Sequence, residues 1–342
     1  RMCQFCTSDS EDAKLSAPSF FSIKNLLYDC MFLLLAKILF SIVKPKAVFV
    51  FGQYRMTTMA ALMPIFAASK IGLSVSYVNG SSARALFFGL LGFPEIICIM
   101  FKDADDVLPY GFLQKSAKKY FLVLTGAVDI PYGIEVFASE KELAEPFVPL
   151  VKSLKSGDGL IVLDDDVTFR DLKDGALGKV HTFGFHSDGD VYVSNTSLLT
   201  DEKFLDQGKG VMAVLNAKIN TQKQSLPLWL YNVAGRSHLY GVAAASATAL
   251  MFGMNLLEIA EALKEYRPPR GYLRILKGRK DVTILDDSAD ATLFSMLEAI
   301  ETLDNFSSKT RIAVIGDLTG VAKPEAAMRN IAVQAIKRCD IL

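Results

Sequence analysis

The order of apolar runs along the chain constrains its fold more than any other feature of the sequence. From residue 46, short runs rich in Val, Ile and Phe alternate with longer segments that have the periodicity of helices. Because these runs have no polar side, they are typical of strands buried on both faces of a parallel sheet between helices. The sequence therefore predicts a doubly wound, mostly parallel α/β sheet. The expected strands are residues 47–51, 73–78, 96–101, 121–126 and 160–165.

The pattern changes after Asp166, where shorter strand-like runs are separated by polar turns. Runs of this kind favour antiparallel strands, so we expect an antiparallel extension of the first sheet. The expected strands are residues 179–185, 190–195, 210–219 and 225–232. The expected helices are residues 139–159, 235–254 and 255–266. The second of these helices is rich in alanine, so it can lie close to its neighbours.

The stretch PPRG at residues 268–271 is the strongest linker signal in the sequence. Beyond it the alternation of strands and helices starts again and covers only the front half of a Rossmann-like unit. Its expected strands are 272–278, 281–287 and 311–317, and its expected helices are 292–303 and 326–338. We therefore expect three parts: an N-terminal tail and apolar helix (1–44), a central domain (45–268) and an incomplete C-terminal domain (269–342).

The charge balance argues against partners that are recognised through a global electric field. The 37 basic and 37 acidic residues cancel, so net charge favours neither nucleic acid nor an anionic membrane. The five cysteines are an odd number, which indicates a reducing compartment rather than a framework of disulfides. We therefore expect a cytoplasmic protein with no nucleic-acid partner.

One segment, residues 26–43, approaches the apolar character of a membrane helix. Asp29 and Lys37 interrupt it, and a charge near the centre of a spanning helix costs about 2.5–3.5 kcal/mol. We therefore expect a buried or interfacial helix. Peripheral membrane contact through this segment stays open as an alternative.

Residues 48–59, VFVFGQYRMTTM, have the outline of a phosphate-binding loop. An apolar strand breaks at a glycine, passes through a short polar stretch and meets two threonines that start a helical pattern. Backbone N–H groups and a lysine hold the phosphates in such P-loop folds, and this stretch has no lysine. It is either a modified nucleotide site or a plain turn from strand to helix. The candidate nucleotide contacts are Gly52, Arg55, Thr57 and Thr58.

The ordered motifs of the second half resemble those of the Mur ligases. They are the alanine-rich segment NVAGRSHLYGVAAASATALMFGM, the junction PPRG, the Asp-Asp-Ser of DVTILDDSAD, and RIAVIGDL. The resemblance covers about residues 45–340 and is closest to the branch that adds D-alanyl-D-alanine to a UDP-N-acetylmuramoyl tripeptide. It implies that ATP phosphorylates a peptide carboxylate and that an amine then attacks the acyl phosphate. It also implies ATP and Mg²⁺ as cofactors, and a UDP-muramoyl peptide or a nucleotide as ligand.

Where the family's loop reads Gly-x-x-Gly-Lys-Thr-Thr, this sequence has Arg55 for the second glycine and Met56 for the lysine. A side chain at the first position obstructs the approach of a phosphate, and methionine removes a charge-assisted contact. The family's metal-binding carboxylates have no direct match either. The weak candidates for Mg²⁺ ligands are Asp103, Asp105 and Glu135, from which we predict no metal site.

The resemblance also points to contacts in the second half of the chain. His238 matches a family histidine that meets the adenine end of the nucleotide, although a packing role is the plainer interpretation. Arg270 flanks the junction where the family has an arginine. The remaining candidates are Asp286 for the nucleotide, and Asp287, Ser288 and Asp290 for the substrate. Asp290 would repel the carboxylate of an acceptor dipeptide.

Three hypotheses follow from these departures. We favour a catalytically impaired homologue that binds a precursor, a nucleotide or a partner, because the losses all fall on phosphoryl transfer. An active ATP-dependent ligase is the alternative, in which Arg55, Arg270 and an aspartate of residues 103–106 replace the lost groups. Each replacement would have to restore geometry to within about half an ångström. The third hypothesis is a gene product without a selected activity.

Overall fold

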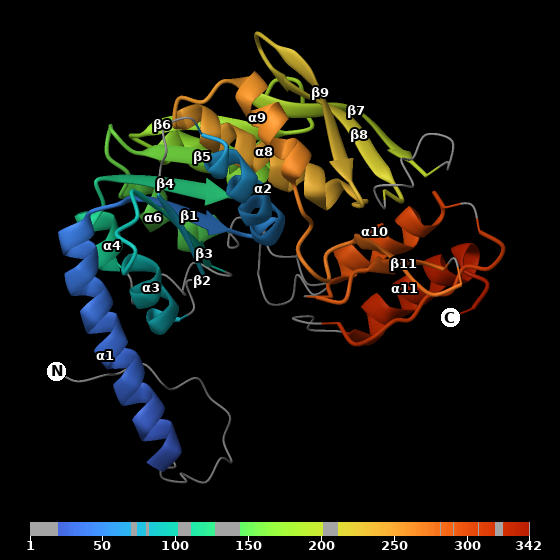
Figure 1. Ribbon diagram of the computed structural model, residues 1–342, viewed down its shortest axis with the longest axis horizontal. Coiled ribbons are helices and arrows are strands. Elements are labelled where there is room, and N and C mark those ends of the chain that lie inside the picture. The colour runs from blue at the N-terminus through green and yellow to red at the C-terminus, as the bar shows by residue number, and fades with distance from the viewer. Residues whose placement is uncertain are drawn as a thin grey trace.

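The computed structural model describes residues 20–69, 74–79, 82–101, 111–126, 144–200, 211–280, 282–289, 291–306, 308–318 and 324–341. These residues form a central sheet with helices on both faces, and a smaller C-terminal segment beside it (Figure 1).

The central sheet has nine strands in the described residues, in the order β2-β3-β1-β4-β5-β6-β7-β8-β9. The strands from β1 to β7 run parallel, and β8 and β9 are antiparallel to their neighbours. The bounds are β1 Lys46–Phe51, β2 Val75–Asn79, β3 Ile96–Phe101, β4 Lys119–Leu124, β5 Gly159–Leu163, β6 Lys179–Gly184, β7 Val191–Leu199, β8 Val214–Thr221 and β9 Ser225–Tyr231. This architecture confirms the predicted doubly wound fold with an antiparallel extension.

The antiparallel part begins later than the sequence suggested. β6 pairs in parallel with β5, and β7 pairs in parallel with β6 at Phe183↔Val191 and Gly184↔Tyr192. The loop between them turns back along β6, where Asp190 accepts hydrogen bonds from the backbone N–H and the hydroxyl of Thr182. β7 therefore starts level with the end of β6 and continues in the same direction.

Side chains alternate along the buried strands and so build two cores. On β1, Val48 and Val50 face one side, and Phe49 and Phe51 face the other. The first side is covered by α2 (Arg55–Ala67), α8 (Arg236–Met251) and α9 (Leu256–Ala262). The second side is covered by α1 (Phe20–Val43), α3 (Ala83–Leu90), α4 (Gly111–Ser116), α6 (Val148–Lys152) and α7 (Val167–Arg170).

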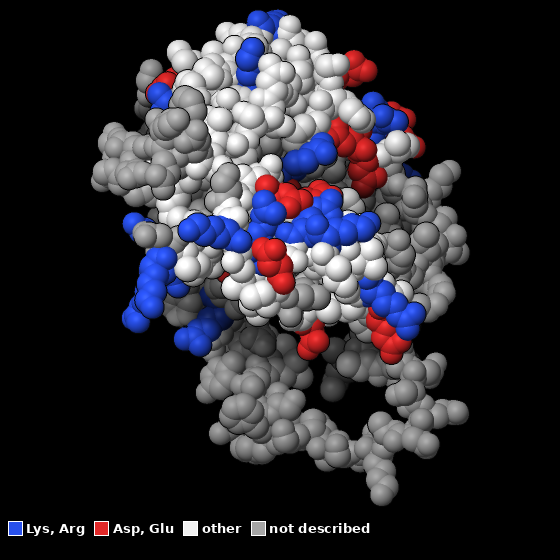
Figure 2. Space-filling view, turned by 90° about the vertical axis from the view of Figure 1, so that its right-hand side faces the viewer, with Lys and Arg blue, Asp and Glu red and all other residues white. Residues whose placement is uncertain are grey.

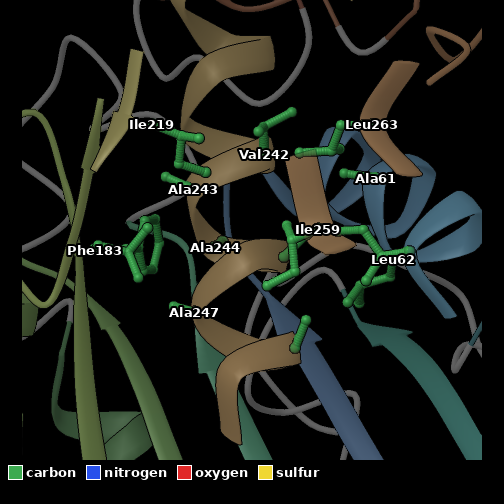
Figure 3. Packing of buried hydrophobic residues seen from close by; sticks show 14 of the residues in the cluster. Ala61, Leu62, Phe183, Ile219, Val242, Ala243, Ala244, Ala247, Ile259 and Leu263 are labelled. Atoms are coloured by element: carbon green, nitrogen blue, oxygen red, sulfur yellow. The ribbon is translucent and has the colours of Figure 1, made fainter. Parts of the chain in front are cut away.

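Helix α8 is the centre of the first core. Its alanines are fully buried, and Figure 3 shows Ala243, Ala244 and Ala247 facing neighbours from the sheet and from other helices. A Cβ added at Gly241 would lie 2.3 Å from the hydroxyl of Thr57 at the start of α2. The small side chains thus let α8 lie close to α2, as the sequence predicted.

The helix predicted at 139–159 is shorter and broken where it is described. A 3₁₀ turn, Glu145–Phe147, is followed by α6, and each contains a proline, Pro146 or Pro149. Because proline has no N–H to donate, it fits the start of a helix better than its interior. The first residues of the predicted helix lie outside the described part of the chain.

The C-terminal segment has its own sheet of two antiparallel strands, β10 (Arg274–Lys277) and β11 (Thr283–Asp286), and two helices, α10 (Leu293–Leu303) and α11 (Pro324–Arg338). The strand predicted at 311–317 was wrong. Ile312 makes only an isolated bridge with Ile341, and Val314 is 95% exposed. Figure 2 shows one face of the molecule, on which a band of Lys and Arg side chains is bordered by Asp and Glu. In the C-terminal segment, Arg311 and Arg338 both form ion pairs with Asp304.

Candidate functional site

The loop between β1 and α2 lies where the direction of the strand order changes. From β1 the chain goes to β2 and β3 on one side of the sheet, and then to β4 and β5 on the other. In open α/β sheets, ligands bind beside the carboxyl ends of the strands at such a switch point. Residues 52–58 therefore occupy the position expected of a binding loop.

Gly52 fixes the path of this loop. Its φ of +97° is a conformation that favours glycine, and an added Cβ would lie 2.1 Å from the carbonyl oxygen of Gly126. The glycine is therefore required by the close approach of two backbone segments.

The first backbone N–H groups of the loop are bonded within the protein. The N–H of Gln53 donates to the carbonyl of Gly126 at 3.4 Å, and that of Tyr54 to the hydroxyl of Thr125 at 3.1 Å. The N–H of Arg55 donates to the carbonyl of Gly52 at 3.3 Å. A phosphate-binding loop needs such N–H groups directed at its ligand. Here three consecutive groups are directed at protein acceptors.

The side chains of the candidate residues also face the protein. Arg55 is buried, and its Nη1 donates to the carbonyl of Gly52 at 3.3 Å. The hydroxyl of Thr57 lies 3.0 Å from the carbonyl of Tyr54 and 3.1 Å from that of Ser237, and both share its single proton. The hydroxyl of Thr58 donates to the carbonyl of Tyr54 at 2.8 Å. The structure thus brings the predicted residues together, but with their polar groups bonded to the backbone.

Aromatic rings lie beside the loop. The ring of Tyr54 stacks on that of Tyr240, with centroids 4.5 Å apart and planes 10° apart. Phe185 packs edge-on against Tyr240, and the guanidinium of Arg236 lies 4.4 Å from the Phe185 centroid. These contacts couple the loop to the amino-terminal part of α8.

Asp165 anchors this aromatic group. Its carboxylate accepts hydrogen bonds from the hydroxyl of Tyr240 at 2.9 Å and from the N–H groups of Phe185 and His186. Burial, and then the negative charge of Asp165, raise the pKa of the Tyr240 hydroxyl, so it remains a proton donor. Sequence reasoning missed Asp165, although its place at the end of the strand predicted at 160–165 was a usable signal.

His238 is buried on α8. Its Nε2 must donate to the carbonyl of Tyr272 at 2.9 Å because a carbonyl only accepts, and its Nδ1 accepts from the hydroxyl of Tyr266 at 2.7 Å. Burial lowers the pKa of the imidazole to about 4. The ring is therefore neutral, and both of its nitrogens join α8 to the segment around residue 270.

The junction after α9 is held by two neighbouring carboxylates. Asp286 accepts from the N–H of Gly271 at 3.2 Å and from the hydroxyl of Ser288 at 2.7 Å, and it lies 3.5 Å from Arg274. Asp287 accepts from the N–H of Leu273 at 3.2 Å. Its pKa is raised to about 7, mainly by burial, and then, despite that hydrogen bond, by the charge of Glu298. Arg270 is exposed.

Glu298 of α10 occupies the amino end of α8. Its carboxylate accepts hydrogen bonds from the N–H groups of Arg236 and Ser237. The amino end of a helix attracts anions through these N–H groups and the helix dipole. A protein carboxylate thus takes a position that a phosphate could otherwise use. Burial raises the pKa of Glu298. The sequence alone gave no signal for this contact.

The described part of the chain contains no cluster of metal ligands. Among the described residues, no group of three or more His, Cys, Asp or Glu side chains could hold a metal ion. The candidates Asp103, Asp105, Glu135 and Asp290 lie outside the described residues.

No family model matches the sequence, and no curated protein matches it. Solved structures match the fold. Acinetobacter baumannii MurF has a TM-score of 0.72 at 16% identity over 90% of this chain and 65% of its own. Thermotoga maritima MurF in complex with ADP has a TM-score of 0.69 at 17% identity over 96% of this chain and 71% of its own. Escherichia coli FolC in complex with DHPP and ADP has a TM-score of 0.61 at 13% identity over 90% of this chain and 77% of its own.

The likeness extends across both the central sheet and the C-terminal segment, since it covers nine tenths or more of the chain. The chain therefore has the Mur ligase fold. It spans about 65% of the length of Acinetobacter baumannii MurF.

Proposed function

We propose that this chain, which has the Mur ligase fold, is a Mur ligase homologue that has lost the ligase reaction and acts by binding or regulation. The proposal includes a cytoplasmic location, a central domain at residues 45–268 and a C-terminal domain at residues 269–342. The observation that carries it is the loop at residues 52–58, where the N–H groups of residues 53–55 and the side chains of Arg55 and Thr58 are bonded to the protein itself.

The ligase reaction needs a triphosphate held in line, with positive charge on the transferred group. The described residues do not fit a triphosphate with its metal. Met56 supplies no charge, and the guanidinium of Arg55 is turned onto the carbonyl of Gly52. A phosphate approaching the loop would have to displace these internal hydrogen bonds. We therefore assign no phosphoryl-transfer step to these residues.

The ligand we propose is a UDP-muramoyl peptide or a nucleotide. Relatives of the same fold include Mur ligases named for UDP-N-acetylmuramoyl substrates, and one FolC bound to ADP. The candidate contacts are Gly52, Arg55, Thr57, Thr58, His238, Arg270, Asp286, Asp287, Ser288 and Asp290. Of those that are described, Arg270 is exposed and could meet a ligand without rearrangement, whereas His238 would have to give up two hydrogen bonds.

An active ligase with relocated groups is the second candidate. The exposure of Arg270, beside the junction at Gly271, is the observation that favours it, because a guanidinium there can turn toward a phosphate. This candidate also needs a metal ligand from residues 103–106.

Measurements of phosphate release and of ligand binding together distinguish the impaired homologue from the active ligase. The full chain is mixed with ATP, Mg²⁺, UDP-N-acetylmuramoyl tripeptide and D-alanyl-D-alanine. We expect no phosphate release above background, and we expect the UDP ligand alone to raise the melting temperature. A ligand at a hundred times its dissociation constant stabilises a protein by about 2.7 kcal/mol. Phosphate release that requires both substrates would instead establish the ligase.

A further inference from the structure

Helix α1 is apolar on two opposite faces. One face packs on α3 and α4, where Ala36 and Phe40 are fully buried and Phe32 contacts Phe87 with centroids 5.6 Å apart. Figure 1 shows that the helix lies at the edge of the central sheet and extends beyond α3. A helix that is apolar all round is normally covered on every side.

The second face of α1 is uncovered. Its residues follow the spacing i, i+3, i+4, i+7 and i+11, so they form one stripe along the helix. The stripe consists of Met31 (45% exposed), Leu34 (60%), Leu35 (38%), Ile38 (52%) and Ile42 (66%). Contiguous exposed apolar area of this kind marks an interaction surface.

Exposed lysines lie on α1 and near its carboxyl end. Lys118 lies beside it because its N–H donates to the carbonyl of Pro45 at 3.1 Å. The exposed lysines of this region are Lys37, Lys44, Lys115, Lys118 and Lys119. Two carboxylates of the described residues are close to them: the exposed Glu95, whose carbonyl accepts from the N–H of Lys46, and the partly exposed Asp158, which accepts from the N–H of Tyr120 beside Lys119. The region is therefore basic, although the chain as a whole is neutral.

We propose that the α1 surface, defined as the stripe and its five lysines, docks the protein on an anionic lipid bilayer. Helices that lie in a membrane interface place apolar side chains among the acyl chains and lysines among the headgroups. One signal alone gives marginal binding, whereas an apolar face together with a basic group gives stable attachment. Charge complementarity thus selects an anionic bilayer as the occupant. Among the residues that the structure describes, none of the helices has the length and apolar character that a membrane span needs.

A second copy of the chain fits this surface less well. Two parallel α1 helices that face each other through the stripe would bring the lysines at the carboxyl end of each helix near those of the other copy. Like charges across an interface oppose association. The two occupants are nevertheless separable by experiment.

The test is co-sedimentation of the full chain with vesicles of phosphatidylcholine alone, or mixed with phosphatidylglycerol. We expect binding to the mixed vesicles that weakens with salt. The apolar variant Leu34→Ser, Ile38→Ser, Ile42→Ser should lower the partition coefficient about 100-fold or more. The basic variant Lys115→Gln, Lys118→Gln, Lys119→Gln should lower it roughly fivefold per lysine.

A matched control makes the same change at exposed apolar positions elsewhere: Leu257→Ser, Val333→Ser, Ile336→Ser, which are 58%, 51% and 71% exposed. This control should bind vesicles as the unmodified chain does, and circular dichroism should show that all variants are folded. The proposal is overturned if the unmodified chain does not bind the mixed vesicles, or if the apolar variant binds as well as the control. Loss of a dimer in the apolar variant, without vesicle binding by the unmodified chain, would identify a second copy as the occupant.

Discussion

At the scale of single residues, the loop after β1 depends on Gly52. The glycine combines a positive φ with a backbone contact that leaves no room for a Cβ. The fold therefore requires a glycine at this position whether or not a ligand binds. The sequence indicated a glycine at a turn, but only the neighbouring strand β4 explains why no other residue fits.

We expect Gly52→Ala to destabilise the protein by about 2–4 kcal/mol, because the methyl group clashes with the carbonyl of Gly126 and the backbone is strained. Urea unfolding measures the change. Gly157→Ala is the matched control, since a Cβ there meets nothing within 4 Å, and it should be neutral or slightly stabilising. Equal stability of the two variants would contradict the assigned packing of the loop.

Two buried groups at the junction give opposite dependences on pH. The pKa of Asp287 is raised from 3.8 to about 7, so its contribution to stability is present at low pH and is lost as the pH rises toward 7. The pKa of His238 is lowered from 6.5 to about 4, so its contribution is present above pH 6.5 and is lost as the pH falls toward 4. Between these limits the two effects oppose each other.

Asp287→Asn should therefore make the protein more sensitive to acid. With only the contribution of His238 left at this junction, stability should fall by up to about 1.4 kcal/mol per pH unit as the pH drops from 6.5 toward 4. Urea midpoints across this range measure the slope. Asp286→Asn is the neighbouring control: the pKa of Asp286 is lowered, so this change should reduce acid sensitivity. A variant at Asp287 whose profile runs parallel to that of the unmodified chain would refute this assignment.

At the scale of elements, the amino end of α8 is stabilised from another part of the chain. Glu298 of α10 accepts the first N–H groups of α8, and Gly235 leaves space for its carboxylate, since a Cβ there would lie 3.0 Å from Glu298 Cδ. This contact joins the C-terminal segment to the central core. Ala213, Ala234, Ile275 and Phe306 form a small apolar cluster that also links the two parts.

Glu298→Ala should lower the free energy of unfolding by about 1–2 kcal/mol, because the first two N–H groups of α8 lose their acceptor. Glu298→Gln keeps an acceptor oxygen and should cost less. Glu325→Ala changes an exposed glutamate in the first turn of α11 and serves as the control. If the changes at Glu298 and Glu325 have the same effect on chemical denaturation, the capping role of Glu298 is wrong.

The sequence predicted best those strands whose burial is evident from a continuous apolar run. The strands at 96–101 and 121–126 are continuous apolar runs, and β3 and β4 formed within two residues of the predicted bounds. The run at 311–317 is also apolar, but a strand needs partners on its edges. In the described residues the sheet of β10 and β11 has two strands, and Ile312 reaches only Ile341, so this run joins no sheet. Whether such a run forms a strand depends on long-range contacts that the local pattern does not contain.

At the scale of the whole molecule, the fold and the site differ in how far they could be predicted. The doubly wound sheet follows from periodicity, and the structural matches at 16–17% identity confirm the fold. The site depends on long-range contacts such as Tyr54 with Tyr240 and Glu298 with Arg236. These pairs are far apart in sequence, so no local motif reports them. The loss of the lysine at Met56 was visible in the sequence, whereas the internal bonding of the loop was not.

The whole-molecule proposal also predicts how nucleotide binding could be restored. Arg55→Gly with Met56→Lys removes the guanidinium from the loop and returns a fixed positive charge to the start of α2. We expect this double variant to gain at least tenfold in affinity for ATP with Mg²⁺, since a charged hydrogen bond is worth about 1.5–3 kcal/mol. Met63→Lys is the matched control, because it adds the same charge at an exposed position of the same helix.

The central claim is that the N–H groups of residues 53–55 and the side chains of Arg55, Thr57 and Thr58 are bonded within the protein, so the loop does not hold a triphosphate. Isothermal titration calorimetry of the unmodified chain with ATP and Mg²⁺ tests it most directly. The account predicts no saturable heat for the unmodified chain and for Met63→Lys, and saturable binding for the double variant. Saturable, Mg²⁺-dependent binding by the unmodified chain that is lost on changing Arg55 would contradict it.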